Sequence, residues 1–121
     1  MSPLKTEIQG KVATLTLNRP AQMNTMDLGM AKALYEASLS FTEHSTVRAL
    51  IITGAGEKAF CAGGDLAAFN QYGEAVGEHL HEVTHYLHGA ISRFARMTLP
   101  VITAVNGVTA GGGLAFLGFP Q

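Results

Sequence analysis

The sequence is poor in cysteine, tryptophan and charge. Its 121 residues include one cysteine and no tryptophan, and charged side chains make up 14% of the chain. A single cysteine excludes an internal disulfide framework and is typical of proteins from a reducing compartment. The formal net charge of −1 gives no electrostatic reason to expect a nucleic-acid partner.

The sequence shows no long apolar run, and we also expect no secretion signal. No stretch approaches the roughly 18 uninterrupted apolar residues that a membrane-spanning helix needs, so we expect no membrane association. The N-terminus lacks a charged segment followed by an apolar one, which a secretion signal would show. A length of 121 residues predicts one domain with one modest core, and the hydrophobic fraction of 47% fits a buried α/β chain. With a single cysteine, no expected signal and no expected membrane span, we expect a cytoplasmic protein.

Hydrophobic periodicity predicts strands that alternate with helices. The expected strands cover 12–17, 47–53 and 101–105, and a short strand with a tight turn at Gly10 precedes them. The expected helices run from Thr25 or Asp27 to about residue 43, and from 74 to 96. Strands separated by helices favour parallel pairing. The order therefore predicts an α/β fold with a largely parallel sheet and flanking helices.

Two glycine-rich segments follow short apolar runs, at Ala59–Leu66 and Asn106–Leu114. Glycine allows positive φ angles and a close approach of the backbone to a ligand. Gly111–Gly113 also precedes an apolar segment that we expect to be a short helix, whose free N–H groups would favour an anion. If the fold brings both turns together, two backbone N–H groups can point at one oxygen, as in an oxyanion hole.

A literal H-E-x-x-H motif, from His81 to His85, competes for the function. In zinc proteases the two histidines of this motif bind the metal and the glutamate acts as a base. No acidic residue follows Glu82, so a downstream acidic ligand is missing. The histidines, with His88, lie opposite the predicted apolar stripe, and we expect a solvated helix face without a metal. An adventitious site on the three histidines is the alternative. The stripe comprises Val76, Leu80, Val83, Leu87, Ala90, Ile91 and Phe94.

Two further patterns also have a plain structural interpretation. Gly54–Ala59 is a formal G-x-G-x-x-A, but it runs into 60–64, which cannot form the first helical turn that a dinucleotide site needs. Cys61 has no histidine tied to it by a motif. We therefore expect Cys61 to be a small buried thiol rather than a nucleophile.

With these residues identified, the chain resembles the enoyl-CoA hydratase/isomerase family, also called the crotonase family. Four ordered segments carry the resemblance: 12–20 with Asn24, 47–56, 59–66, and 100–108 with 110–114. The resemblance implies a spiral of ββα units, of which residues 1–121 would form the N-terminal part. It also implies acyl-CoA substrates, assembly into homotrimers or hexamers, and no separate cofactor, since coenzyme A enters as part of the substrate.

The resemblance also implies which residues form the site. The backbone N–H groups of Gly64 and Gly112 would make the oxyanion hole. Further residues would contact the coenzyme A moiety, largely through their main chain, and these are Met23, Ala62, Asp65 and Leu66.

The chain departs from the family pattern at Ala115, where hydratases of this family carry a glutamate. Water addition to a double bond uses two carboxylates as acid and base, so the departure favours isomerisation or another enolate reaction. A hydratase-type lyase and a non-catalytic fragment or assembly subunit are the alternatives. The candidates for the acid/base are Glu74, Glu78 and Glu82. The apolar run 114–119 at the end of the chain suggests an unfinished core, covered by a partner chain or by further sequence.

Overall fold

Four strands form a sheet in the computed structural model, which describes residues 2–41, 46–111 and 113. They are β1 (Leu4–Gln9), β2 (Val12–Leu17), β3 (Ala49–Gly54) and β5 (Val101–Ala104), in the order β1-β2-β3-β5. The β1–β2 pair is antiparallel, and the β2–β3 and β3–β5 pairs are parallel. The predicted largely parallel sheet is therefore confirmed, and so is the turn at Gly10, whose φ is +62°.

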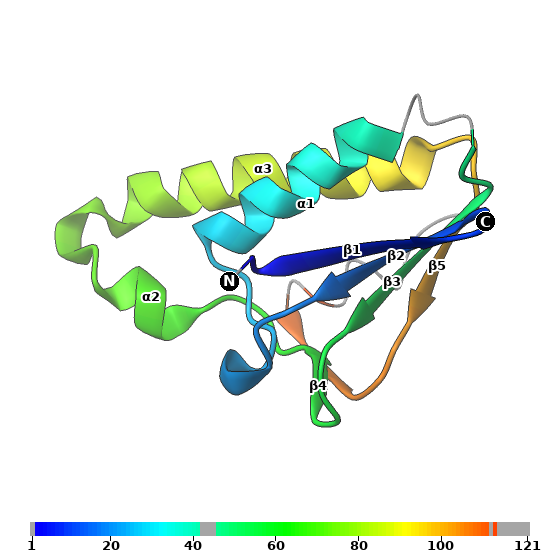
Figure 1. The fold of residues 1–121 in the computed structure, drawn as a ribbon. Helices are drawn as coiled ribbons and strands as arrows, with labels where there is room; N and C mark the ends of the chain where they lie inside the picture. Colours follow the sequence, from blue (N-terminus) through cyan, green and yellow to red (C-terminus); the bar gives the residue numbers. More distant parts are fainter. Residues whose placement is uncertain (1, 42–45, 112, 114–121) are drawn as a thin grey trace.

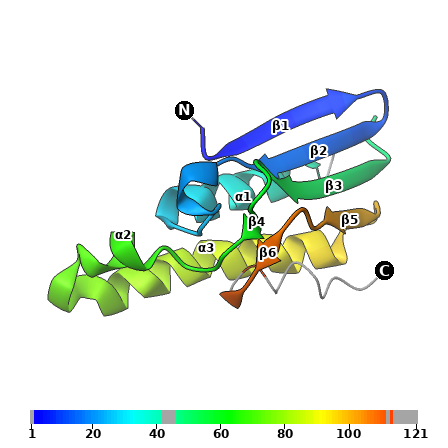
Figure 2. The same cartoon turned by 90° about the horizontal axis from the view of Figure 1, so that it is seen from below.

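Two long helices cover one face of this sheet (Figures 1 and 2). Helix α1 (Leu28–Phe41) starts after Asp27, whose Oδ1 accepts the Met30 N–H at 2.9 Å. Helix α3 (Val76–Arg96) packs along α1. The alternating residues Ala13, Leu15 and Leu17 of β2 are buried in the core that both helices share. The two-residue period of the strand thus gives the sheet one apolar face for the helices.

A second, two-stranded parallel sheet joins β4 (Ala59–Cys61) to β6 (Val108–Thr109), which run side by side in Figure 2. The Val108 N–H donates to the Lys58 carbonyl at 3.1 Å, and the Ala110 N–H donates to the Cys61 carbonyl at 3.1 Å. The sequence predicted only turns here, because strands of two or three residues show no periodicity. Ala59–Leu66 is therefore a strand, a turn and the first residue of α2 (Leu66–Asn70).

The beginning of α3 differs from the predicted apolar stripe. Leu80 was expected to be buried but is 38% exposed, whereas His79 is only 8% exposed. At this end α3 extends beyond α1 and lies beside α2 (Figure 1). The His79 ring stacks on Tyr72 at 3.6 Å between centroids and meets the edge of Phe69 at 5.7 Å. Helix α3 packs against α2 at its start and against α1 further along, so a different side of α3 is buried in each part. Two 3-10 turns, η1 (Pro20–Gln22) and η2 (Gly73–Ala75), complete the described elements.

Asn24 is fully buried and makes three hydrogen bonds to the backbone. Its Oδ1 accepts the Arg19 N–H at 2.8 Å, and its Nδ2 donates to the carbonyls of Ala55 and Ala59, both at 3.0 Å. Its φ of +54° lies in the left-handed region, which asparagine tolerates better than most residues. One amide therefore links the end of β2 to both ends of the β3–β4 loop.

Asn106 holds the same loop from the other side. Its Oδ1 accepts the Gly54 N–H at 3.1 Å, and its Nδ2 donates to the carbonyls of Gly56 at 3.0 Å and Ala59 at 3.2 Å. A Cβ on Gly54 would lie 2.9 Å from the side-chain amide of each asparagine. The glycine at the start of the G-x-G-x-x-A pattern is therefore required by packing, and the pattern leads into a strand rather than a helix.

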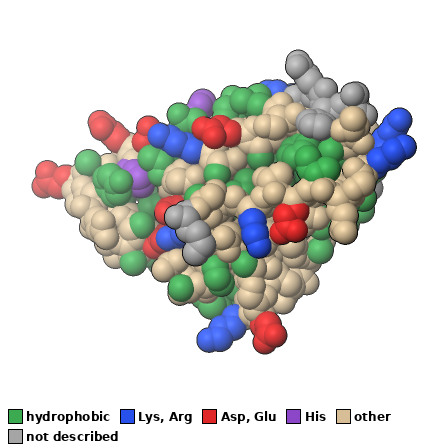
Figure 3. All heavy atoms as spheres, in the orientation of Figure 1, with side chains coloured by type: hydrophobic (Ala, Val, Ile, Leu, Met, Phe, Trp, Pro, Cys, Tyr) green, Lys and Arg blue, Asp and Glu red, His purple; other side chains and the backbone are tan. Residues whose placement is uncertain are grey.

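The surface carries charges of both signs. Figure 3 shows acidic and basic side chains interspersed over one face of the molecule. Among the described residues, no helix combines the length and the apolar character needed to cross a membrane.

Replacing Asn24 by glycine tests how much the buried amide stabilises the fold. Glycine keeps the positive φ without strain, so the Asn24→Gly change removes only the side-chain hydrogen bonds. We expect the free energy of unfolding to fall by about 3 kcal/mol, because buried backbone groups lose their partners. Equilibrium unfolding in urea measures this difference.

The matched control for this prediction is Met23→Gly, because Met23 is the preceding residue and has a φ of +57°. The control keeps the same backbone conformation and removes no side-chain hydrogen bond found among the described residues. We expect it to cost clearly less than Asn24→Gly. An Asn24→Gly protein as stable as the control would contradict the role given to the amide.

Candidate functional site

The two glycine turns are in contact. A Cβ on Gly63 would lie 3.3 Å from the Ala110 carbonyl oxygen, and one on Gly111 would lie 3.3 Å from the Gly63 Cα. Both residues have positive φ angles, +109° for Gly63 and +53° for Gly111. A Cβ on Gly113 would lie 2.5 Å from the Cys61 carbonyl oxygen. The turns approach each other so closely that only glycine fits at these positions.

The direction of the Gly64 N–H follows from one hydrogen bond. The Gly63 carbonyl accepts the Met26 N–H at 2.7 Å. In a trans peptide the C=O and the following N–H point in opposite directions, and the described chain has no cis peptide bond. The Gly64 N–H therefore points away from Met26. Within the part of the chain that the structure describes, it has no hydrogen-bond partner.

The segment 59–65 lies between two other segments. On one edge, the Ala62 N–H donates to the Met23 carbonyl at 3.1 Å, and the Asp65 N–H donates to the Met26 carbonyl at 2.9 Å. On the other edge it pairs with 108–110 through β4 and β6. An N–H that points away from Met26 therefore lies on the side of the second glycine turn. This is the arrangement that an oxyanion hole requires of its first donor.

The structure brings together some of the expected site residues. Met23 and Ala62 are joined by the hydrogen bond just described, and Gly64 is exposed to solvent. The Leu66 side chain is 73% exposed. Gly112, the expected second donor, and Ala115 lie outside the described residues, as does the segment expected to form the short apolar helix.

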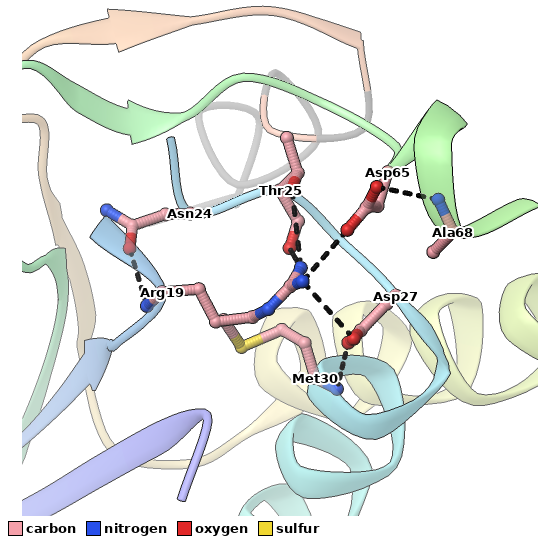
Figure 4. Close-up of polar contacts among 7 residues, drawn as sticks. All are labelled: Arg19, Asn24, Thr25, Asp27, Met30, Asp65 and Ala68. Carbon is pink, nitrogen blue, oxygen red and sulfur yellow. Dashed lines mark hydrogen bonds and ion pairs between the residues drawn. The ribbon is translucent and has the colours of Figure 1, made fainter. Parts of the chain in front are cut away.

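Asp65 takes part in an ion pair that the sequence did not predict (Figure 4). Its Oδ2 lies 2.8 Å from Nη2 of Arg19, and the two side chains are 11% and 17% exposed. Its Oδ1 accepts the Ala68 N–H at 3.0 Å and so caps helix α2. This N–H, and then the Arg19 guanidinium, hold the pKa of Asp65 below its usual value. In the sequence, Arg19 stands out only as one residue of the segment 12–20, because ion pairs between distant segments leave no local pattern.

Phe69 borders the site on the side of helix α2. A Cβ on Gly64 would lie 2.9 Å from Cε2 of the Phe69 ring. Phe69 in turn contacts the buried His79 ring. The sequence does not indicate Phe69, because the five residues of α2 are too few to display a helical stripe. It does not indicate the burial of His79 in α3 either, because that burial depends on contacts with Phe69 and Tyr72.

The histidines of the H-E-x-x-H motif lie on a solvated helix face, as predicted. His81, His85 and His88 are all exposed on α3. The described residues contain no cluster of three or more His, Cys, Asp or Glu side chains placed to hold a metal ion.

The acid/base candidates Glu74, Glu78 and Glu82 are also exposed, in η2 and the first turns of α3. None of their three carboxylates makes a hydrogen bond or an ion pair within the described part of the chain. All three therefore stay candidates.

Comparison of the sequence with known proteins finds similarity to proteins of one family. A family model described as enoyl-CoA hydratase/isomerase matches residues 12–118. The 3-hydroxyisobutyryl-CoA hydrolase, mitochondrial, of Danio rerio is 38% identical over 109 residues, which are 87% of this chain and 28% of that protein. The 1,2-epoxyphenylacetyl-CoA isomerase of Escherichia coli (strain K12) is 37% identical over 114 residues, which are 93% of this chain and 43% of that protein.

Solved structures agree with this result. An enoyl-CoA hydratase from Bacillus anthracis superposes with a TM-score of 0.86 at 30% identity, over 94% of this chain and 43% of that chain. An enoyl-CoA hydratase/carnithine racemase from Magnetospirillum magneticum superposes with a TM-score of 0.85 at 33% identity, over 96% and 43% of the two chains. The chain spans less than half the length of these similar proteins.

Cys61 provides a test of the buried-thiol interpretation. The side chain is fully buried, and burial raises the pKa of its thiol, an effect that a hydrogen bond from the Gly63 N–H partly offsets. We expect iodoacetamide at neutral pH to react at least about 100-fold more slowly with the folded protein than with the protein in urea, because reaction requires local opening. Mass spectrometry of the alkylated thiol measures both rates. Equal alkylation rates in the folded and the unfolded protein would contradict the burial of Cys61 and would make it a candidate nucleophile.

Proposed function

Because the chain belongs to the enoyl-CoA hydratase/isomerase family, we propose that it binds an acyl-CoA and stabilises negative charge on the thioester oxygen. One observation carries the proposal: the two glycine turns touch at Gly63 and Gly111, and the Gly64 N–H points away from Met26 without a partner among the described residues. Gly112 would supply the second N–H. Met23, Ala62, Asp65 and Leu66 would contact the coenzyme A moiety.

The proposed reaction is migration of a double bond through an enolate. A base removes the proton next to the thioester carbonyl, and the electron pair moves onto the carbonyl oxygen. The two N–H groups stabilise that oxygen before the proton returns to a more distant carbon. In enzymes, removing one such donor lowers kcat by about 100- to 1000-fold.

Two observations favour isomerisation over hydration. Ala115 carries no carboxylate, whereas hydration uses an acid and a base on the two sides of the double bond. In addition, one of the similar proteins is named 1,2-epoxyphenylacetyl-CoA isomerase. Glu74, Glu78 and Glu82 are the candidates for the single acid/base. A hydratase-type lyase and a non-catalytic subunit are the alternatives that the assays below separate.

Thioester hydrolysis is a second candidate, because the Danio rerio protein and several other similar proteins are named as 3-hydroxyisobutyryl-CoA hydrolases. In hydrolysis, water adds to the thioester carbonyl and the coenzyme A thiolate then leaves. The tetrahedral intermediate carries its negative charge on the same oxygen. One pair of N–H donors can therefore serve either reaction, and the products distinguish them.

Three assays on the natural protein test the proposal. A 3-enoyl-CoA reports isomerisation, crotonyl-CoA reports hydration, and 3-hydroxyisobutyryl-CoA reports hydrolysis through the thiol that it releases. We expect turnover of the 3-enoyl-CoA and negligible hydration of crotonyl-CoA. Thiol release without isomerisation would favour the second candidate, and robust hydration would contradict the preference for isomerisation. Absence of binding heat with every acyl-CoA in calorimetry would support a non-catalytic role.

Two substitutions at Gly64 test the N–H itself. Proline removes this N–H and alanine keeps it, while both place a Cβ at the same 2.9 Å from the Phe69 ring. Gly64 does not have a positive φ, so a side chain causes no left-handed strain. We expect kcat of Gly64→Pro to be about 100-fold or more below that of Gly64→Ala.

The readout for this pair is steady-state kinetics on whichever acyl-CoA is turned over, with circular dichroism to verify folding. Because alanine reproduces the contact of the Cβ with Phe69, the ratio between the two variants measures the loss of the N–H together with the ring carbons that replace it. Equal kcat values in two folded variants would remove Gly64 from the proposed oxyanion hole.

A further inference from the structure

The Gly63–Gly64 peptide plane is fixed by a pairing between two short segments. Met26 donates its N–H to the Gly63 carbonyl at 2.7 Å and accepts the Asp65 N–H at 2.9 Å. This is an isolated parallel bridge between Met26 and Gly64, outside every named strand. A single bridge has no neighbouring ladder to support it, so its geometry depends on contacts made by side chains.

The Arg19 guanidinium contacts both sides of this bridge (Figure 4). On the Met26 side, its Nη1 donates to the Thr25 carbonyl at 2.6 Å and its Nη2 lies 3.5 Å from the Asp27 carboxylate. On the Gly64 side, the same Nη2 donates to the Asp65 carboxylate at 2.8 Å. The residues before and after Met26, and the residue after Gly64, are therefore tied to one planar group.

We propose that Arg19 is a positioning residue that fixes the direction of the Gly64 N–H by tying Thr25 to Asp65 through its two short hydrogen bonds. The catalytic part of this inference rests on the proposed function, because only an oxyanion hole gives that direction a chemical consequence. Arg19 does not reach the substrate in this scheme. It acts through the bridge between Met26 and Gly64. The bridge fixes the orientation of the Gly63–Gly64 peptide plane, and this orientation fixes the direction of the Gly64 N–H.

The chemistry of the guanidinium suits this role. It is planar and carries several donors in a fixed arrangement, so one side chain can bind two segments at once. The Arg19 and Asp65 side chains are largely buried, so solvent screens their ion pair less than it screens an exposed pair. A lysine would retain the charge but not the fixed arrangement of donors.

Asp27 offers a matched control for Asp65. Each aspartate caps a helix through Oδ1, Asp27 at the Met30 N–H and Asp65 at the Ala68 N–H, and each faces the same Nη2 of Arg19 through Oδ2. Asparagine keeps the capping oxygen in both cases and removes the charge. Only Asp65, however, directly follows Gly64 and belongs to the peptide that closes the bridge.

Amide hydrogen exchange tests the positioning without any assumption about the substrate. In Asp65→Asn and Arg19→Met, we expect the Met26 and Asp65 N–H groups to exchange about tenfold faster, since a charge-assisted hydrogen bond that held them is lost. In Asp27→Asn, their exchange should stay within about threefold of the original rate. The Ala110 N–H, bonded to Cys61 on the other edge of the segment, should be unchanged in all three variants. Exchange resolved by NMR on the natural protein measures all these amides.

Kinetics tests the catalytic consequence. We expect kcat to fall about tenfold in Asp65→Asn and Arg19→Met with KM within about threefold, because the donor is misdirected while the substrate contacts persist. Arg19→Lys should lie between Arg19→Met and the original protein. Asp27→Asn should retain both constants.

The outcomes separate this inference from the proposed function. Faster exchange together with lower kcat, in the Asp65 and Arg19 variants only, supports it. Unchanged exchange in these variants overturns it, whether or not the protein turns over an acyl-CoA. Faster exchange with an unchanged kcat, in a protein that Gly64→Pro inactivates, also overturns it. Failure of every acyl-CoA assay contradicts the proposed function, while the exchange rates still decide whether Arg19 holds the bridge.

Discussion

The site depends on the hydrogen bond from the Met26 N–H to the Gly63 carbonyl. This bond is made at one edge of a planar trans peptide, so the N–H of Gly64 must point from the opposite edge. The pairing of β4 with β6 places the second glycine turn on that other side. Neither contact creates the site alone. The hydrogen bond determines the direction of the Gly64 N–H, and the strand pairing places the second glycine turn on the side to which it points. The glycines permit both, because a Cβ on Gly63 or Gly111 would meet the backbone of the opposite turn.

Polar side chains, together with the buried Phe60 and Cys61 of the apolar core, connect this segment to the rest of the molecule. Asn24 and Asn106 both donate to the carbonyl of Ala59, the first residue of β4, while Arg19 pairs with Asp65. A buried polar group is costly when it lacks a partner, so networks of this kind favour one arrangement over alternatives of similar packing. The apolar core places α1 and α3 against the sheet. The asparagines and the arginine then hold the loops in the positions that the proposed chemistry needs.

Several features of the fold were predictable because they depend on short sequence ranges. The alternation in β2, the tight turn at Gly10 and a helix cap at Thr25 or Asp27 follow from local preferences. The structure confirms the first two and places the cap at Asp27. The burial of His79 in place of Leu80 was not predictable, since it depends on Phe69 and Tyr72 of a neighbouring segment. Strand β6 was missed as well, because two residues cannot display a period.

The sequence by itself determined the order of the two long helices and of the strands in the four-stranded sheet, and the solvated histidine face of α3. It also determined that glycine-rich turns stand at 63–64 and 111–113. It also supplied the family motifs, because these depend on residue types at fixed spacing. The tertiary structure decided that the two glycine turns touch and that the Gly64 N–H points away from Met26. It also decided that Arg19 reaches Asp65, 46 positions further along the chain. The reason is physical: periodicity and local preference act over a few residues, whereas hydrogen bonds between distant segments exist only after the chain has folded.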